Sequence, residues 1–589
     1  MPTTNNADIF RILTVSPNLI QIEVLDAERF KQDETTFTIG SYLKISDDSN
    51  TSIIALVQSF KIKDTNSGGE SSVIAPSFIL DAQPIGFLDD ENRFKRGGQQ
   101  IAIPPNQVSI ADESILRSIY ESVESDKKFI FSSLAQQPLI DIAVDGDKFF
   151  SKHIAVVGST GSGKSGTVAR ILQEGIKSSA DQTQRGVLNN THILLFDLHG
   201  EYKTAFPISK KLDVGNLVLP YWLMNSEELE EMFIESNENN SHNQISQFRY
   251  AVIQNKKKHN LTVLNPSYDA PLYFSLSEVQ NFITNLNNEV IGKLDGDNAR
   301  PKLSDGTLVD DRCNFYFESK RSFVVSSTAA ATKASNGPFN GEFDRFIMRL
   351  ESKINDNRLS FLLKPMKSPT VEFATSDFPE ILKQFIGYTD TKKDNITIID
   401  LSGIPFEVLS IVVSLISRLV FDFCFYYKAV KQETEESPFL LVLEEAHNYI
   451  PQSESAKYRS VKKSIERIAK EGRKYGLSLM IVSQRPSEIS ETIFSQCNNF
   501  VAMRLTNPTD QQYVKRLMPD SVSTITDTLP VLERQEALII GDSIPIPTIV
   551  RIKDLTDKPD SKDIAFHQEW KKDWSTIIFD ELIKKIKKE

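Results

Sequence analysis

Residues 158–165 read Gly-Ser-Thr-Gly-Ser-Gly-Lys-Ser and are the most informative stretch of the chain. They satisfy the phosphate-binding pattern G-x-x-x-x-G-K-[S/T] and stand between an apolar run, 154–157, and a helix-like stretch, 167–177. Glycines at these positions let successive backbone N–H groups point at the phosphates of a nucleoside triphosphate. The predicted nucleotide-binding residues are Gly158, Ser159, Thr160, Gly161, Ser162, Gly163, Lys164, Ser165 and Gly166.

This loop predicts ATP and Mg²⁺ as cofactors. Lys164 is expected to reach the β and γ phosphates, and Ser165 is expected to offer its hydroxyl to Mg²⁺. The alternative is an ordinary glycine-rich turn, which the flanking strand-like and helix-like stretches disfavour.

A second chemical pattern is an apolar run, 440–443, that ends in the acid pair Glu444-Glu445. It is similar to the Walker B element, in which the first acid holds the Mg²⁺ shell and the second activates the attacking water. Glu444 is therefore the predicted metal residue and Glu445 the predicted general base. A strand that simply enters a solvated loop is the alternative, and the intact phosphate loop makes it less attractive.

Two further strand-like runs also end in polar side chains. Gln484 follows 479–483, where an amide can bond both a phosphate oxygen and the lytic water, so it is a predicted γ-phosphate sensor. Asp197 follows 193–196 with Glu201 four residues later, and Asp197 is a predicted contributor to the Mg²⁺ shell. A capped turn before Pro486 and a surface turn at Gly200 are the respective alternatives.

Composition indicates a soluble globular protein of several domains. The chain has 589 residues, 40% hydrophobic and 25% charged, and a formal net charge of −12. That net charge does not exclude a basic channel that binds nucleic acid inside a ring-shaped assembly. The attraction between phosphates and basic side chains is local, because it is screened beyond about 10 Å at 0.1 M salt. The three cysteines lie far apart, which favours a reducing, cytoplasmic location.

One stretch, 404–427, is superficially similar to a membrane span. Glu407, Arg418 and Asp422 interrupt it, and its uncharged part is only about ten residues long. We therefore expect a buried helix and no membrane association.

The order of apolar patterns predicts an α/β protein in five parts. Alternating runs such as 20–24 and 60–63 indicate an N-terminal β-barrel over 1–110. Apolar strand-length runs separated by helical patterns indicate a parallel sheet covered on both faces, over 111–214 and 390–555. A helix-rich insert, 215–389, separates these halves, and an amphipathic helical tail, 556–589, ends the chain.

The combination of motifs resembles the HerA branch of the HerA/FtsK ring translocases over roughly residues 8–555. The motifs that carry it are the phosphate loop, Asp197 to Tyr202, Glu444-Glu445-Ala446-His447, Glu471-Gly472-Arg473-Lys474-Tyr475-Gly476 and Ser483-Gln484-Arg485-Pro486. The resemblance implies an N-terminal β-barrel, a RecA-like P-loop ATPase core with a helical insert, and a homo-hexamer whose channel passes double-stranded DNA.

Two positions depart from the family's pattern. Lys152 stands where an Arg is frequent, and it lacks the planar fork that grips phosphate oxygens in pairs. Gln535 stands where a Gly is common, so the local turn is expected to differ.

Hydrolysis in such rings needs a cation that neutralises the γ phosphate, often from the adjacent subunit. Arg467 and Arg473 are the catalytic candidates from the matching stretch, and both are equally compatible with ordinary helix-surface charges. For contact with DNA phosphates, the candidate pore residues are Arg459, Lys462 and Lys463, with 256–258 as a second choice.

Two functions fit these motifs. The first is an ATP-hydrolysing DNA translocase or helicase-like motor that works with a separate nuclease or other effector subunit, in DNA processing or antiviral defence. The second is a nucleotide-controlled hexameric scaffold that assembles and activates an effector enzyme. A metabolic P-loop kinase is disfavoured by the acid pair, the Gln-ended strand and the large additional domains.

Overall fold

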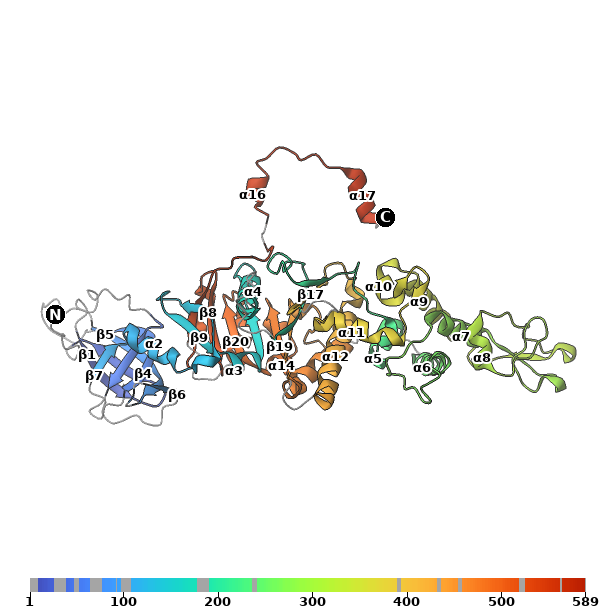
Figure 1. The fold of residues 1–589 in the computed structure, drawn as a ribbon, viewed down its shortest axis with the longest axis horizontal. Coiled ribbons are helices and arrows are strands. Elements are labelled where there is room, and N and C mark those ends of the chain that lie inside the picture. Colours follow the sequence, from blue (N-terminus) through green and yellow to red (C-terminus); the bar gives the residue numbers. More distant parts are fainter. Residues whose placement is uncertain are drawn as a thin grey trace.

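The computed structural model describes residues 9–25, 39–46, 52–63, 77–89, 91, 93–96, 107–176, 190–235, 241–388, 394–431, 436–453, 458–517, 525–561 and 564–587. The chain is laid out along one axis (Figure 1). A small β-domain lies at one end, a large sheet with its helices in the centre and a helical insert at the other end. A C-terminal segment stands off from the centre.

The N-terminal domain is a curled antiparallel sheet. Its strand order is β1-β2-β5-β4-β3-β7, with β6 paired to β5, and the edge strands β1 and β7 contact each other. Alternate side chains fill its inside, among them Ile20, Ile22 and Val24. The strands are β1 Phe10–Val15, β2 Ile20–Val24, β3 Tyr42–Ser46, β4 Ser52–Lys63, β5 Ser77–Leu88, β6 Phe94–Arg96 and β7 Gln107–Ile110. The small-barrel fold expected from period-two patterning is confirmed.

The central sheet follows the order β12-β17-β11-β18-β19-β10-β20-β21-β22-β8-β9. Strands from β12 to β20 run parallel, and the remaining ladder is antiparallel. The parallel strands are β10 His153–Val157, β11 His192–Asp197, β12 Lys210–Leu212, β17 Ile396–Asp400, β18 Phe439–Leu443, β19 Leu477–Ser483 and β20 Cys497–Met503. The antiparallel ones are β8 Lys128–Leu134, β9 Asp141–Asp145, β21 Glu536–Gly541 and β22 Thr548–Ile552. The four apolar runs quoted from the sequence, 154–157, 193–196, 440–443 and 479–483, are all strands of this sheet.

Helices cover this sheet because its strands are apolar on both faces. The covering helices and the short segments around them are α2 Glu113–Glu121, α3 Gly146–Phe150, α4 Lys164–Ile176, α12 Phe406–Val430, α13 Arg459–Glu471, α14 Glu491–Phe494 and α15 Pro508–Leu517. Helix α12 packs against α13. By length and composition α12 could cross a membrane, but 78% of its most apolar window is buried in the protein. It is therefore a core helix, as the interrupting charges predicted.

The insert is mainly helical. Its helices are α5 Ser226–Phe233, α6 Ser241–His259, α7 Leu276–Asn288, α8 Arg312–Glu318, α9 Asp344–Ile354, α10 Ser360–Leu363 and α11 Phe378–Ile386. Two short antiparallel ladders lie among them, β13 Val290–Gly292 with β14 Ala334–Asn336 and β15 Met366–Ser368 with β16 Val371–Glu372. Ser275 caps α7, as its sequence indicates, but the Glu278 carboxylate bonds Asn255, Lys258 and His259 instead of closing a reciprocal capping box.

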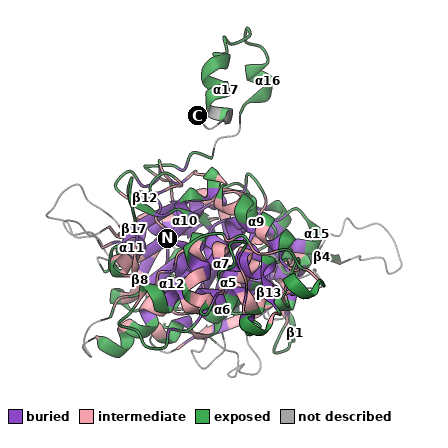
Figure 2. Ribbon diagram, turned by 90° about the vertical axis from the view of Figure 1, so that its right-hand side faces the viewer, coloured by how far each residue is buried: buried purple, intermediate pink, exposed green. Residues whose placement is uncertain are grey.

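The C-terminal segment extends away from the rest of the chain (Figures 1 and 2). It contains the short helices α16 Phe566–Glu569 and α17 Phe579–Lys587. Its large apolar side chains are exposed: Trp570 is 77% and Trp574 101% accessible. The described side chains of 564–587 are all exposed, so they add nothing to the core of their own protomer.

Candidate functional site

The phosphate loop leaves the end of β10, between β19 and β20 in the sheet. Gly158 must be glycine, because a Cβ there would lie 2.6 Å from Ser162 Oγ and 2.8 Å from Met503 Cβ. Gly163 has a φ of +103°, which only glycine adopts without strain. Neighbouring strands fix the loop, since the Ser159 N–H donates to the Arg504 carbonyl at 2.7 Å.

A cavity of about 860 Å³ opens beside this loop at the carboxyl ends of the parallel strands. Such edges are where open α/β sheets bind ligands. The cavity is lined by Thr160, Gly161, Gly163, Lys164, Ser165, Gly166, Thr167, His199, Glu201, Glu444, Glu445, Gln484, Arg534, Gln535, Ile552, Lys553, Asp554, Leu555, Lys558, Pro559 and Ser561. Six of the nine predicted loop residues therefore face the cavity, together with the predicted acid pair and sensor.

The acid pair meets the loop directly. Glu445 Oε1 lies 4.0 Å from Lys164 Nζ, and the two side chains are 9% and 7% exposed. The backbone of Glu445 is left-handed, with a φ of 47°, an unfavourable conformation for a residue with a Cβ. Backbone strain of this kind clusters at functional sites.

Burial dominates the electrostatics of the cavity. It raises the pKa of Glu444 well above its ordinary value, and the neighbouring Glu445 and Asp197 add to this shift. Burial also lowers the pKa of Lys164, although Glu445 and Glu444 act in the opposite direction. Several acids thus share one buried lysine, and a bound cation would favour the ionised form of Glu444.

The residues fit a magnesium ion held together with a nucleotide. Glu444 Oε2 and Glu445 Oε2 are buried and have no hydrogen-bond partner among the described residues. Ser165 lines the same cavity. Within the described ranges no three His, Cys, Asp or Glu side chains form a metal cage, which suits Mg²⁺ because it is usually bound by one or two protein oxygens and substrate phosphates.

Asp197 departs from its predicted place in the metal shell. Its Oδ1 accepts the N–H groups of Gly200 and Glu201, and its Oδ2 accepts that of Tyr202, at 2.9–3.1 Å. It is fully buried and organises the turn after β11 rather than lining the cavity. That turn instead presents Glu201 to the cavity, the second acid of the same sequence motif.

Gln484 lies against the phosphate loop. Its Oε1 accepts a 2.6 Å hydrogen bond from Thr160 Oγ1, directly after β19 ends at Ser483. The amide is therefore placed where it can respond to a phosphate bound in the loop.

Residues 131–420 match the family model described as the central domain of the helicase HerA. The chain is a HerA-like ATPase.

Several proteins similar to this HerA-like chain come from archaea. A probable helicase of Methanocaldococcus jannaschii is 24% identical over 92% of this chain and 92% of its own length. The DNA double-strand break repair helicase HerA of Sulfolobus acidocaldarius is 26% identical over 72% of this chain and 69% of its own. That of Pyrococcus furiosus is 38% identical, over 23% of this chain and 25% of its own.

Solved structures with similar chains include VirB4 of Thermoanaerobacter pseudethanolicus. It covers 74% of this chain and 98% of its own, with 11% identity and a TM-score of 0.44. The plasmid coupling protein TrwB in complex with ADP and Mg²⁺ covers 77% of this chain and 95% of its own, with 14% identity and a TM-score of 0.43.

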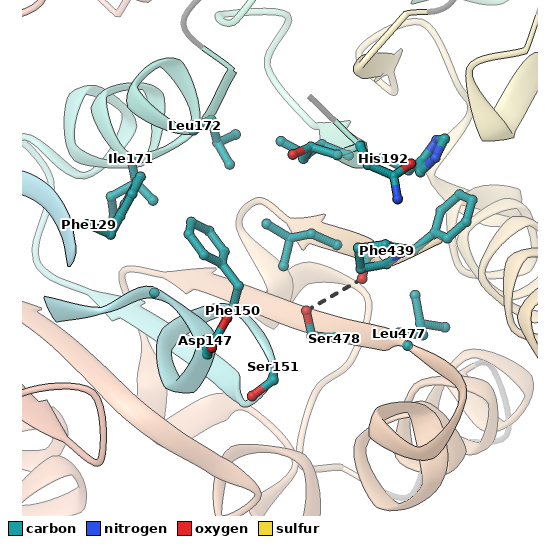
Figure 3. A pocket seen from close by; sticks show the side chains of 18 of the residues that line it. Phe129, Asp147, Phe150, Ser151, Ile171, Leu172, His192, Phe439, Leu477 and Ser478 are labelled. Atoms are coloured by element: carbon teal, nitrogen blue, oxygen red, sulfur yellow. Dashed lines mark hydrogen bonds between the residues drawn. The ribbon is translucent and has the colours of Figure 1, made fainter. Parts of the chain in front are cut away.

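In this HerA-like protomer neither arginine candidate lines the nucleotide cavity. Arg467 stacks over the Phe421 ring at 4.4 Å and lies 3.8 Å from Glu471. Arg473 borders a different cavity of about 540 Å³, at the amino-terminal edge of the same sheet (Figure 3). Phe150, Leu172 and Phe439 are among the side chains of this second cavity. A catalytic role for either arginine requires a neighbouring subunit. Lys152, at the departing position, pairs with Asp542.

The basic residues that were candidates for contact with DNA differ in their burial and in their ion pairs. Lys256 is fully buried, and its ammonium donates to the carbonyls of Tyr268 and Ala270, so it is not a DNA-facing residue. Lys258 bonds Glu278, and Lys463 pairs with Glu227. Arg459, at the start of α13, is exposed.

Sequence patterns missed two parts of the site. Residues 553–561 form one wall of the cavity, held by Gln173 on the Asp557 carbonyl and by Thr204 on the Lys558 carbonyl. No motif marks this segment, because backbone carbonyls make its contacts. The other part is the role of His447, a member of the Glu444-Glu445-Ala446-His447 motif to which the sequence assigned no function; its Nδ1 lies 3.3 Å from Glu445 Oε2.

Proposed function

We propose that this chain is the ATP-driven motor of a cytoplasmic homo-hexamer that moves double-stranded DNA. It works with a separate nuclease or other effector subunit, in DNA processing or antiviral defence. The observation that carries the proposal is the convergence of Lys164, Ser165, Glu444 and Glu445 on one cavity, although they come from segments far apart in the sequence.

Each of these side chains has a place in ATP hydrolysis. Lys164 and the loop N–H groups bind the phosphates, and Glu445 accepts a proton from the attacking water. Ser165 and Glu444 would hold Mg²⁺, which neutralises phosphate charge when it is bound. Gln484 orients the water or senses the γ phosphate through the loop it already contacts.

Three observations support assembly and DNA as the partner. The relatives that share most of this chain's length are named as helicases, in several cases of DNA double-strand break repair. The exposed apolar tail is a surface suited to a second copy of the chain, because contiguous apolar surface of this kind usually marks an interface. The candidate arginines also need a neighbour to reach a nucleotide.

ATP turnover tests the proposed catalytic site. We expect Lys164→Ala to abolish nucleotide binding and turnover together. We expect Glu445→Gln to keep binding but to lose turnover by about 100-fold or more, because it removes the base. Glu113→Gln, an exposed pair with Arg117 on α2, is the matched control. Wild-type turnover in Glu445→Gln would contradict the assignment.

Linear duplex DNA tests the motor itself. A translocase is expected to hydrolyse ATP faster when duplex is added, with a stimulation that falls steeply as salt rises. Stimulation only by a co-purifying protein would instead support the scaffold function, to which the exposed tail is equally suited.

A further inference from the structure

His447 occupies a position behind the proposed catalytic base. Its side chain is 8% exposed, and it lies outside the lining of the nucleotide cavity. Its Nδ1 is 3.3 Å from Glu445 Oε2 and 3.2 Å from Ser483 Oγ. One ring nitrogen therefore faces both the base and the end of β19.

The chemistry of the two neighbours decides what this nitrogen does. An ionised carboxylate only accepts hydrogen bonds, whereas a hydroxyl both donates and accepts. Ser483 Oγ already accepts the Arg485 N–H at 3.0 Å. A hydrogen bond between the ring and Glu445 therefore requires the neutral tautomer with the proton on Nδ1, and Ser483 Oγ keeps a second lone pair that can accept from the same N–H. Burial lowers the pKa of His447, which favours the neutral ring.

The Glu445 carboxylate needs such support. Its Oε2 lies within reach of His447 but has no aligned hydrogen bond among the described residues. Oε1 is held only loosely, 4.0 Å from Lys164. A small rotation of the carboxylate toward Nδ1–H would complete the bond and set the direction of Oε1.

Ser483 connects this pair to the phosphate loop. Its carbonyl accepts the Gly158 N–H at 3.3 Å, and the next residue, Gln484, bonds Thr160. Two residues of the first half of the loop, Gly158 and Thr160, thus bond the strand end that His447 contacts.

We propose that His447 is a positioning residue that orients the Glu445 carboxylate through Nδ1–H and couples it, through Ser483, to the strand end that carries Gln484. This rests on the proposed function, since it assigns a role toward the base of ATP hydrolysis. His447 itself touches neither the nucleotide nor the water.

Three substitutions at this position test the inference. His447→Ala is expected to lower kcat by about 10-fold or more, in the range seen for partners that orient functional groups, while ATP affinity changes less than about twofold. His447→Asn is expected to recover most of kcat, because its amide N–H stands near the place of Nδ1–H. His447→Gln is expected not to recover it, because its amide stands near Nε2. His242→Ala, exposed on α6, is the matched control.

A second measurement separates positioning from a structural role. In the Glu445→Gln background, single-turnover hydrolysis should fall less than about twofold further on His447→Ala, since His447 acts only through the base. An additive loss, equal kcat for the Asn and Gln variants, or unchanged kcat in His447→Ala would each overturn the inference. A wild-type chain without ATP turnover would contradict the proposed function instead.

Discussion

Two non-glycine residues at the site have left-handed backbones, Glu445 at a φ of 47° and Gln535 at 68°. Gln535 thus adopts a conformation that glycine reaches without strain. Its N–H donates to the Ser162 carbonyl and its carbonyl accepts from Ile552, so the surrounding ladder imposes the conformation. The residue therefore carries backbone strain that a glycine would not.

Gln535→Gly should relieve that strain. A left-handed residue with a Cβ costs about 1–2 kcal/mol, and glycine's extra freedom in the unfolded chain offsets part of the gain, so we expect up to about 1 kcal/mol of stabilisation. The melting temperature of the ATPase core should rise. Gln535→Val, whose branched side chain fits this region worst, should lower it. A higher melting temperature for the valine variant would contradict this account.

At the level of secondary-structure elements, the C-terminal end of helix α6 carries a buried charged side chain, Lys256. Lys256 is enclosed beneath the α6–α7 connection, with Phe274 at 5.6 Å from its ammonium. Burial lowers the pKa of Lys256 from 10.5 to about 8. Between these values the unfolded chain holds the proton more tightly than the folded one, so the stability of the insert should rise with pH across this window.

Comparing the pH dependence of stability between two lysine variants isolates the contribution of the buried ammonium. Lys256→Met should remove a gain of up to about 3 kcal/mol between pH 8 and 10.5, seen as a flatter dependence of the melting temperature on pH. Lys257→Met, exposed on the same turn, should retain the wild-type slope. Identical slopes for Lys256→Met and wild type would show that the ammonium is not buried as described.

At the scale of the whole molecule, a single protomer does not explain why the apolar side chains of the C-terminal tail are exposed. In the proposed ring, Trp570 and Trp574 pack on a neighbouring copy, and each buried aromatic side chain contributes about 2 kcal/mol. Trp570→Ser with Trp574→Ser should therefore shift the mass measured by light scattering from a hexamer toward smaller species. Lys572→Ala, between them, should not. An unchanged mass in the double variant would show that these tail side chains do not contribute to assembly.

Residue patterns alone predicted the elements and most of the site. Short runs that are apolar on both faces, set between helical patterns, are typical of buried parallel strands, and such strands bring their carboxyl ends to one edge. That is why Lys164, Glu444, Glu445 and Gln484 could be predicted to meet before any distance was known.

Tertiary structure alone decided the rest, because those contacts join segments with no shared pattern. Backbone N–H groups took Asp197 out of the predicted metal shell and left Glu201 facing the cavity. Backbone carbonyls hold the 553–561 wall and bury Lys256. The periodicity of the sequence indicates which face of an element is apolar. Every residue has a backbone carbonyl, so the sequence does not indicate which side chain a given carbonyl will bond, and only the folded chain shows it.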